Sequence, residues 1–383
     1  MGISLEKTIL VGIATSKIKL WQAEEHLQEL FRLAETAKAE VVQTFIQRLV
    51  AFNPATLIGD GKLLEIKEAL EAHEAKMVIF DEELSGSQIK NLENKLPGIK
   101  VLDRTGLILD IFAKQAQTSE SRLMVEVAQL EYFMPRLTGR WTHLCRQHNG
   151  GIGTKGPGET KLETDRRFIR KRIQFLNNKL KQIESIRQRQ AENRSDVFHV
   201  GIVGYTNVGK STLMNRLTKA DIYTENKLFA TLDSTTRKLY IDHEHEVILS
   251  DTVGFIRKLP HHLIETFKST LGVVAYADCI LEVIDASASD FSEHLEVTQN
   301  VLEQIIDPKT PKIHVFNKVE VLEAPIRQQL LQKFPHIIQI SAKENIGLEI
   351  LKKQIQKETK KFYKKRKIQE KKAHKSSKSW VST

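Results

Sequence analysis

Residues 200–211, with the sequence VGIVGYTNVGKS, constrain the fold of this chain more than any other stretch. An apolar, β-branched run ends in the pattern Gly-x-x-x-x-Gly-Lys-Ser, and a stretch with helical character follows it. Glycines let successive backbone N–H groups turn towards an anion, and the following helix adds its positive dipole end. The pattern predicts a strand, a phosphate-binding loop and a helix, in which Lys210 reaches the β- and γ-phosphates and Ser211 binds Mg²⁺.

The length of 383 residues favours two or three domains with ample core. No run of eighteen apolar residues occurs, and the first ten residues do not resemble a signal peptide. The two cysteines, Cys145 and Cys279, are far apart in the sequence, which argues against a disulfide scaffold and fits a reducing compartment. We therefore expect a cytoplasmic protein, and we expect it to be a monomer.

The positive charge is concentrated near the C-terminus. Residues 352–378 contain 13 Lys or Arg and 2 Asp or Glu, a net charge of +11, whereas the whole chain carries +10, so the rest sums to −1. A near-neutral body with a basic tail indicates phosphate-rich or anionic partners. The alternative is a solvated, disordered tail.

Residues 1–112 alternate strand-like and helix-like stretches, which predicts a small α/β domain with a parallel sheet covered by helices. Strands are expected at residues 8–14, 41–50, 77–80 and 99–102, and helices at 21–38, 62–73 and 87–96.

Residues 113–195 are predicted to form a helical arm of two long helices. Apolar residues recur every three or four positions in both helices, at Leu123, Val127, Leu130 and Met134, and at Ile169, Ile173, Leu176, Leu180 and Ile183. Seams of this period need a partner helix, and the simplest arrangement pairs the two helices antiparallel.

The connection between these helices, residues 136–161, is long, basic and rich in glycine. Its pattern Gly-x-Gly-x-x-Gly is not a dinucleotide fingerprint, because no strand precedes it and Pro157 stands where the helix would begin. His143, Cys145 and His148 lack a fourth ligand at suitable spacing, which disfavours a metal site. Basic residues suit phosphates and an indole can stack on a base. We therefore predict RNA contacts by Arg140, Trp141, Arg146 and Lys155, with Arg166 and Arg167 nearby.

Residues 196–360 are predicted to form a doubly wound α/β nucleotide domain, followed by the basic tail at 361–383. Strands are expected at residues 197–203, 238–242, 246–250, 279–284, 312–316 and 337–340, and helices near 210–219, 262–274, 291–306, 325–333 and 347–360.

Four short motifs follow the phosphate loop in the order that a GTPase requires. Thr231, in a Phe-Ala-Thr-Leu-Asp switch, can bind Mg²⁺ when the γ-phosphate is present, although Thr235 and Thr236 are rival candidates. Asp251 at a strand end can hold the Mg²⁺ shell, and the Gly254 N–H can contact the γ-phosphate.

The last two motifs indicate guanine. Residues 317–320 (NKVE) resemble the guanine-reading Asn-Lys-x-Asp, with Glu320 in place of Asp, and a backbone N–H within residues 341–343 (SAK) can reach the guanine carbonyl. A glutamate can still accept two hydrogen bonds, but from one methylene further out. ATP use is the alternative, which competition binding would test.

Two residues bear on hydrolysis. Phe255 stands where many GTPases have a Gln that orients the attacking water, so slow intrinsic hydrolysis is expected unless a partner contributes. An Asn at the position of Asn207 resembles the loop of GTPases that use a potassium ion in the transition state; potassium use is a hypothesis here. The predicted catalytic residues are Lys210, Thr231 and Asn207.

Taken together, the motifs resemble the HflX-type translational GTPases of bacteria over residues 7–360. The supporting segments outside the nucleotide motifs are residues 107–113 (LILDIFA), 126–132 (EVAQLEY), 135–137 (PRL), 150–160 (GGIGTKGPGET) and 162–167 (LETDRR). The departures from the family's pattern are Ser234, where a Pro is usual, Glu320 and the basic tail.

The resemblance implies a Ras-like P-loop GTPase domain, GTP-dependent binding to the large ribosomal subunit, splitting of stalled ribosomes and entry of the arm's loop towards the peptidyl-transferase region. Ser211 and Thr231 would bind Mg²⁺. The residues that would line the GTP site are Gly204, Tyr205, Thr206, Asn207, Val208, Gly209, Lys210, Ser211, Phe229, Ala230, Thr231, Leu232, Asp233, Asp251, Thr252, Val253, Gly254, Asn317, Lys318, Val319, Glu320, Ser341, Ala342 and Lys343. A rival function is a GTP-dependent switch at a membrane surface, recruited there by the basic tail.

Overall fold

The fold is taken from a computed structural model, in which the described residues are 6–137, 161–193, 197–218, 228–229, 232–241, 245–258, 263 and 272–379. The chain forms two compact units, Met1–Gln182 with Pro260–Thr266, and Ile183–Leu259 with Phe267–Thr383. Within the described ranges, no helix has the length and apolar character needed to cross a membrane.

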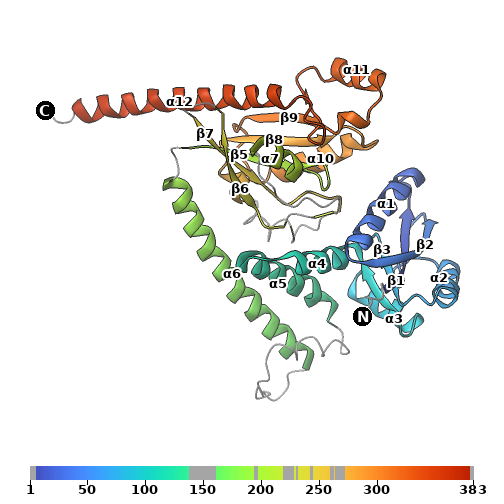
Figure 1. The fold of residues 1–383 in the computed structure, drawn as a ribbon. Helices are drawn as coiled ribbons and strands as arrows, with labels where there is room; N and C mark the ends of the chain where they lie inside the picture. The colour runs from blue at the N-terminus through green and yellow to red at the C-terminus, as the bar shows by residue number, and fades with distance from the viewer. Residues whose placement is uncertain are drawn as a thin grey trace, which may run out of the picture. The chain divides into compact units, whose positions relative to one another are not determined.

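The first unit contains a four-stranded parallel sheet in the order β2-β1-β3-β4 (Figure 1). Its strands are β1 (Glu6–Ala14), β2 (Ala39–Arg48), β3 (Met77–Phe80) and β4 (Lys100–Asp103), which confirms the four strand predictions to within two residues at each end. Parallel neighbours need crossover helices, so both faces of the sheet are covered. The helices between the strands are α1 (Leu20–Thr36), α2 (Asp60–Ala72) and α3 (Gly86–Lys95).

The two faces of this sheet are covered by different helices. Ile9, Val11 and Ile13 of β1 pack in one buried cluster with apolar residues of α2 and α3. On the opposite face a Cβ added to Gly12 would lie 3.4 Å from Leu27 Cδ1 of α1. Gly12 therefore allows α1 to lie close to the strand.

Helix α4 (Arg104–Gln115) was not among the predicted helices, and it spans the domain boundary predicted at residue 112. Its apolar residues are buried almost all round, at Leu107, Ile108, Leu109, Ile111 and Phe112, so the sequence has no polar face to reveal a helical period. The predicted division into domains stays a prediction.

The arm contains α5 (Ser119–Phe133), followed by a short 3₁₀ turn, η1 (Met134–Arg136), and α6 (Lys161–Asn193). The predicted seam of α6 is buried at Ile169, Leu176 and Leu180. Arg172 of α6 pairs with Glu126 of α5 at 2.8 Å, and these residues are about equally far from the connecting loop. This contact supports the predicted antiparallel pairing, and α5 also packs on α4.

The second unit contains a six-stranded sheet in the order β10-β9-β8-β5-β7-β6, in which β6 alone is antiparallel to its neighbour. The strands are β5 (Phe198–Gly204), β6 (Thr235–Tyr240), β7 (Glu246–Asp251), β8 (Cys279–Asp285), β9 (Lys312–Asn317) and β10 (Ile338–Gln339). The doubly wound P-loop fold is thereby confirmed. Strand β6 begins earlier than predicted, so both Thr235 and Thr236 lie within it.

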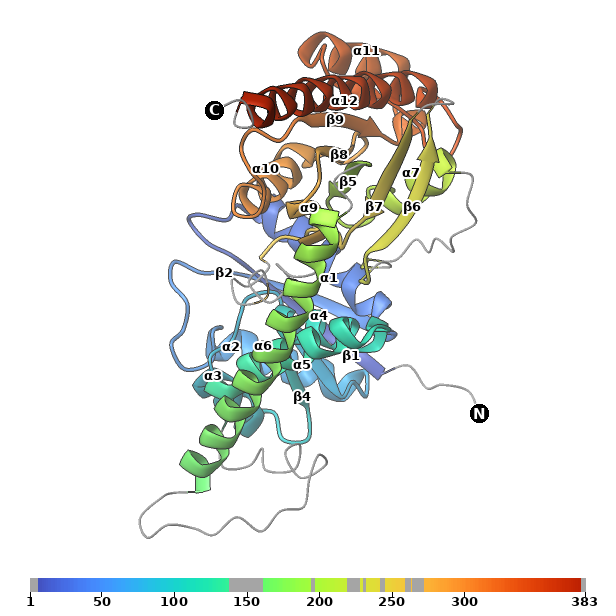
Figure 2. The same cartoon turned by 90° about the vertical axis from the view of Figure 1, so that its left-hand side faces the viewer.

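Helices α7 (Lys210–Thr218) and α10 (Phe291–Leu302) lie on opposite faces of this sheet (Figure 2). The remaining elements of the described part are α9 (Gly272–Ala275), η3 (Val319–Val321), α11 (Ala324–Lys333) and α12 (Leu348–Ser379). Of the helix predicted at 262–274, only Leu263 and the start of α9 lie among the described residues.

The C-terminal helix corrects the prediction that a helix ends at residue 360. Helix α12 continues without a break to Ser379. Phe362 contacts Phe198 of β5 with ring centroids 5.3 Å apart, which anchors the helix beyond the predicted end. Lysine also has good helix propensity, so a run of basic residues does not by itself end a helix.

Candidate functional site

The phosphate loop lies between β5 and α7, at the carboxyl end of the central strand. Gly204 and Gly209 have φ values of 150° and 93°, in the region that favours glycine. A Cβ at Gly204 would stand 2.2 Å from the Val283 carbonyl oxygen, and one at Gly209 would stand 2.4 Å from Asn317 Nδ2. Both glycines are therefore required by close packing as well as by backbone conformation.

Lys210 begins α7 and folds back over the loop. Its Nζ donates to the carbonyl oxygens of Tyr205 at 2.8 Å and Gly204 at 3.2 Å, and the residue is 6% exposed. Burial lowers the pKa of Lys210 from 10.5 to about 8, and the Asp251 carboxylate partly offsets this effect. The ammonium is thus held at the loop at neutral pH, where bound phosphates would stabilise its charge.

GTP affinity should consequently fall as pH rises above about 8, because the free protein then loses the Lys210 proton that bound phosphates would favour. The expected limiting slope is about tenfold per pH unit. Titrating GTP affinity between pH 7 and 9.5 measures it. Lys210→Arg is the matched control, because arginine stays charged over this pH range. All other titrating groups are the same in this variant and in the wild type, so the ratio of the two affinities reports on Lys210. An unchanged ratio of the two affinities across this range would contradict the prediction.

Ser211 and Asp251 supply a pair of oxygen ligands beside the loop. Ser211 Oγ donates to Asp251 Oδ2 at 2.5 Å, and Asp251 is 2% exposed. Its other oxygen, Oδ1, accepts the Thr252 N–H at 2.9 Å, which fixes the carboxylate. Hydroxyl and carboxylate oxygens are ligands that Mg²⁺ prefers, so these two residues fit a magnesium ion bound with a nucleoside triphosphate.

The segment after Asp251 packs directly against the phosphate loop. Phe255 donates its N–H to the Gly204 carbonyl at 3.1 Å and accepts the Thr206 N–H at 2.7 Å. Its side chain is 3% exposed. Phe255 is a packing residue here, and its side chain has no group that could orient water. A Cβ at Gly254 would lie 2.7 Å from the backbone Cα of Thr206 in the phosphate loop, so only glycine fits there.

Asn317, at the end of β9, joins three of the predicted segments. Its Nδ2 donates to the Val208 carbonyl of the phosphate loop at 2.7 Å, and its Oδ1 accepts the Ala342 N–H at 2.9 Å. The side chain is 2% exposed. The structure thus brings the loop, the Asn-Lys-Val-Glu segment and the Ser-Ala-Lys segment together, as the strand-end argument predicted.

The guanine side of the site, formed by residues 317–320 and 341–343, also contains contacts that the sequence did not suggest. Lys318 has a left-handed backbone conformation with φ of 65°, and its Nζ pairs with Asp285 Oδ2 at 2.7 Å. Arg216 of α7 donates to the carbonyl oxygens of Ala342 and Lys343, both at 3.2 Å. Asp285 and Arg216 belong to none of the sequence motifs, so their contacts in the fold are what identify them as support for the guanine side.

Glu320 Oε2 is buried, with no hydrogen-bond partner among the described residues. A buried carboxylate oxygen without a partner is costly, and a donor from a bound ligand would satisfy it. This observation fits the predicted role of Glu320 in accepting hydrogen bonds from guanine.

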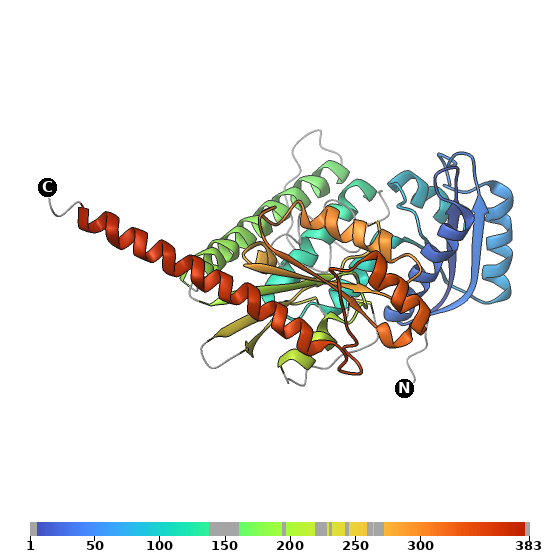
Figure 3. The ribbon, with the colours of Figure 1, turned by 90° about the horizontal axis from the view of Figure 1, so that it is seen from above.

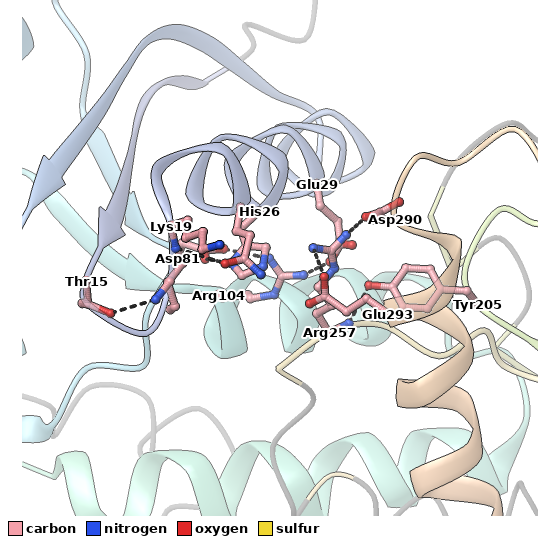
Figure 4. Close-up of polar contacts among 12 residues, drawn as sticks. Thr15, Lys19, His26, Glu29, Asp81, Arg104, Tyr205, Arg257, Asp290 and Glu293 are labelled. Atoms are coloured by element: carbon pink, nitrogen blue, oxygen red, sulfur yellow. Dashed lines mark hydrogen bonds and ion pairs between the residues drawn. The ribbon is translucent and has the colours of Figure 1, made fainter.

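A second cluster in this unit ties the phosphate loop to the start of α10 (Figure 4). The Arg257 N–H donates to the Tyr205 hydroxyl at 2.7 Å, and the Arg257 guanidinium pairs with Asp290 and, at 3.4 Å, with Glu293. The Tyr205 ring stacks on His294 with centroids 3.7 Å apart. The segment after Gly254 is therefore fixed both to the loop and to α10.

Some predicted residues lie outside the described residues, namely Ala230 and Thr231 of the switch and the loop residues Arg140, Trp141, Arg146 and Lys155. His143, Cys145 and His148 lie outside them too. Of the rivals to Thr231, Thr236 bonds through its hydroxyl to Ser250 Oγ at 3.0 Å, which engages it in the sheet. The choice of Thr231 stays a prediction.

Comparison with known protein families gives three matches along the chain. They are the families described as GTP-binding GTPase N-terminal over residues 24–113, GTP-binding GTPase Middle Region over 115–194, and 50S ribosome-binding GTPase over 199–318.

Curated relatives match most of the chain. A GTPase HflX of Caldanaerobacter subterraneus is 51% identical over 356 residues, which cover 92% of this chain and 80% of the relative. A GTPase HflX of Escherichia coli is 44% identical over 347 residues, which cover 90% and 80% respectively.

Among solved structures, a complex of SsGBP with GDP has a TM-score of 0.53 and 26% identity, and the match covers 93% of this chain and 99% of that chain. A GTP-binding protein from Sulfolobus solfataricus, also in complex with GDP, has a TM-score of 0.50 and 25% identity, with 93% and 99% covered.

Proposed function

Because the chain belongs to the HflX family of GTPases, we propose that it binds the large ribosomal subunit in its GTP-bound state and splits or rescues stalled ribosomes. The observation that carries the proposal is the match of residues 199–318 to the 50S ribosome-binding GTPase family, on a domain whose phosphate loop is fully formed. The glycine-rich loop at 136–161 would contact rRNA through Arg140, Trp141, Arg146 and Lys155.

In this proposal the hydrolysis of GTP determines how long the protein stays bound to the ribosome. The loop amides and Lys210 would hold the phosphates, and Ser211 and Thr231 would hold Mg²⁺, which would neutralise charge between the phosphates. Since Phe255 offers no group to orient water, the protein alone would hydrolyse GTP slowly and remain bound until the ribosome completes the site. We place the protein in the cytoplasm as a monomer.

The test is a splitting assay on intact ribosomes followed by gradient separation of the subunits. The protein with GTP, or with a non-hydrolysable analogue, should release free subunits, whereas the GDP-bound protein and Lys210→Ala with GTP should not. If the wild-type protein releases no subunits with either nucleotide, the proposed function is wrong.

Potassium dependence is a separate prediction from Asn207, whose φ is 59°. Hydrolysis should be about tenfold or more faster in potassium than in sodium buffer, because one positive charge aimed at the transition state has effects of this size or larger. Asn207→Gly keeps the left-handed backbone accessible and removes the side-chain ligand, so it should abolish the difference while GTP binding is retained. Equal wild-type rates in the two buffers would exclude potassium.

A further inference from the structure

One face of α12 carries a continuous row of lysines. Lysine recurs at intervals of four or three residues, at Lys353, Lys357, Lys360, Lys364, Lys367, Lys371, Lys375 and Lys378. These intervals keep successive positions on the same face of an α-helix. At about 1.5 Å per residue, this lysine row extends for about 38 Å.

The lysine row faces solvent where the side chains are described. Its first five lysines are exposed, whereas Ile355 on the other side of the helix is buried. None of these five makes an ion pair with any described residue. By contrast Lys352 and Lys361, which lie off the row, pair with Glu349 and Glu358 at 2.9 Å and 2.8 Å.

The charge in the row is not balanced within the helix. Like charges four residues apart destabilise an isolated helix by about 0.2–0.5 kcal/mol per pair. Glu370 is the one acidic residue between positions 359 and 379, so little in the helix relieves this repulsion. A polyanion lying along the row would screen the repulsion between the lysines and attract each of them.

The base of the helix is fixed to the second unit. Phe362 contacts Phe198 of β5, and Tyr363 contacts His245 with ring centroids 4.8 Å apart. Figures 1 and 3 both show the C-terminal half of α12 running out beyond the sheet of this unit. The row is therefore presented on a helix that the GTPase domain holds at one end.

We propose that the lysine row binds the phosphate backbone of double-stranded RNA. Residues 364–379 contain two apolar residues, Ile368 and Ala373, so this part of the helix lacks the apolar face that an interfacial membrane helix or a helix-docking partner needs. Lysines are point charges that suit phosphates without reading sequence. The inference deepens the proposed function, on which it rests for the identity of the RNA as rRNA.

The test uses the full chain with a short RNA duplex and with vesicles that contain phosphatidylserine, over a series of salt concentrations. The row variant replaces Lys357, Lys360, Lys364 and Lys367 by Gln. The matched control replaces four exposed lysines of the first unit by Gln, namely Lys17, Lys67, Lys76 and Lys90. Both variants lower the net charge from +10 by the same amount.

The wild-type protein and the control should bind the duplex with the same salt dependence. The row variant should lose about 0.9 in the slope of log affinity against log salt for each phosphate contact removed, hence about 3–4 in all. An equal loss in both variants, or no loss in the row variant, would overturn the proposal, as would row-dependent binding to vesicles that exceeds binding to RNA. Because the assay contains neither GTP nor ribosomes, a failure to split ribosomes leaves its result unaffected.

Discussion

Replacing Lys210 with alanine should reduce GTP hydrolysis and GTP affinity by about 10²–10³-fold, the size of effect that follows the loss of one preorganised donor to a developing oxyanion. In the structure this ammonium closes the loop on the Tyr205 and Gly204 carbonyl oxygens and lies beside Asp251. Alanine removes both the charge and the donor that would face the β- and γ-phosphates. Single-turnover hydrolysis and titration with a fluorescent GTP analogue measure the two effects.

Two comparisons separate this effect from misfolding. Burial already disfavours the Lys210 ammonium in the folded chain, so Lys210→Ala should leave the melting temperature within a few degrees of the wild type. Lys343→Ala is the matched substitution, since its exposed side chain lies in the segment expected to bind guanine through the backbone. That variant should keep wild-type affinity. Retention of activity within tenfold by Lys210→Ala would show that another group neutralises the phosphates.

The sequence was most informative where a local pattern has a local structural cause. The phosphate loop, the strand ends and the β3 range of Met77–Phe80 follow from residue type, period and glycine placement, and the structure contains them all. Asp251, Asn317 and Ala342 lie along one edge of the sheet because the carboxyl ends of its parallel strands share that edge. The GTPase identification therefore needed no tertiary information.

The parts that escaped prediction depend on tertiary contacts. The apolar residues of α4 are buried almost all round, which hides the helical period that sequence analysis needs. Helix α12 continues past residue 360, where Phe362 contacts Phe198, a residue far away in the sequence. Arg216 supports the guanine side through backbone carbonyls, a role that no residue pattern encodes.

The contacts around the site also suggest how nucleotide binding and fold stability are coupled. The loop is bonded to the segment after Asp251 through Phe255, and to the guanine side through Asn317. A change at either contact should affect both the affinity for GTP and the stability of the second unit, whereas a change at Lys210 should lower the affinity with little change in stability. A substitution of Asn317 therefore tests two predicted effects at once, on GTP affinity and on stability.

Asn317→Ala should lower GTP affinity by about 10²-fold or more and destabilise the second unit by about 2–6 kcal/mol. The substitution leaves the Val208 carbonyl and the Ala342 N–H buried without their partner, at about 1–3 kcal/mol each. It also separates the phosphate loop from the segment that would bind guanine. Thermal unfolding should show a decrease in melting temperature of about 5 °C or more, and titration with GTP measures the loss of affinity.

Two further variants make the result specific. Asn317→Asp keeps the oxygen that accepts the Ala342 N–H but loses the donor to Val208, so its affinity and stability should fall between those of the wild type and Asn317→Ala. Asn300→Ala, an exposed position on α10, should change neither quantity. If Asn317→Ala is destabilised but binds GTP within threefold of the wild type, then Asn317 supports only the fold, and the guanine site must be formed by other residues.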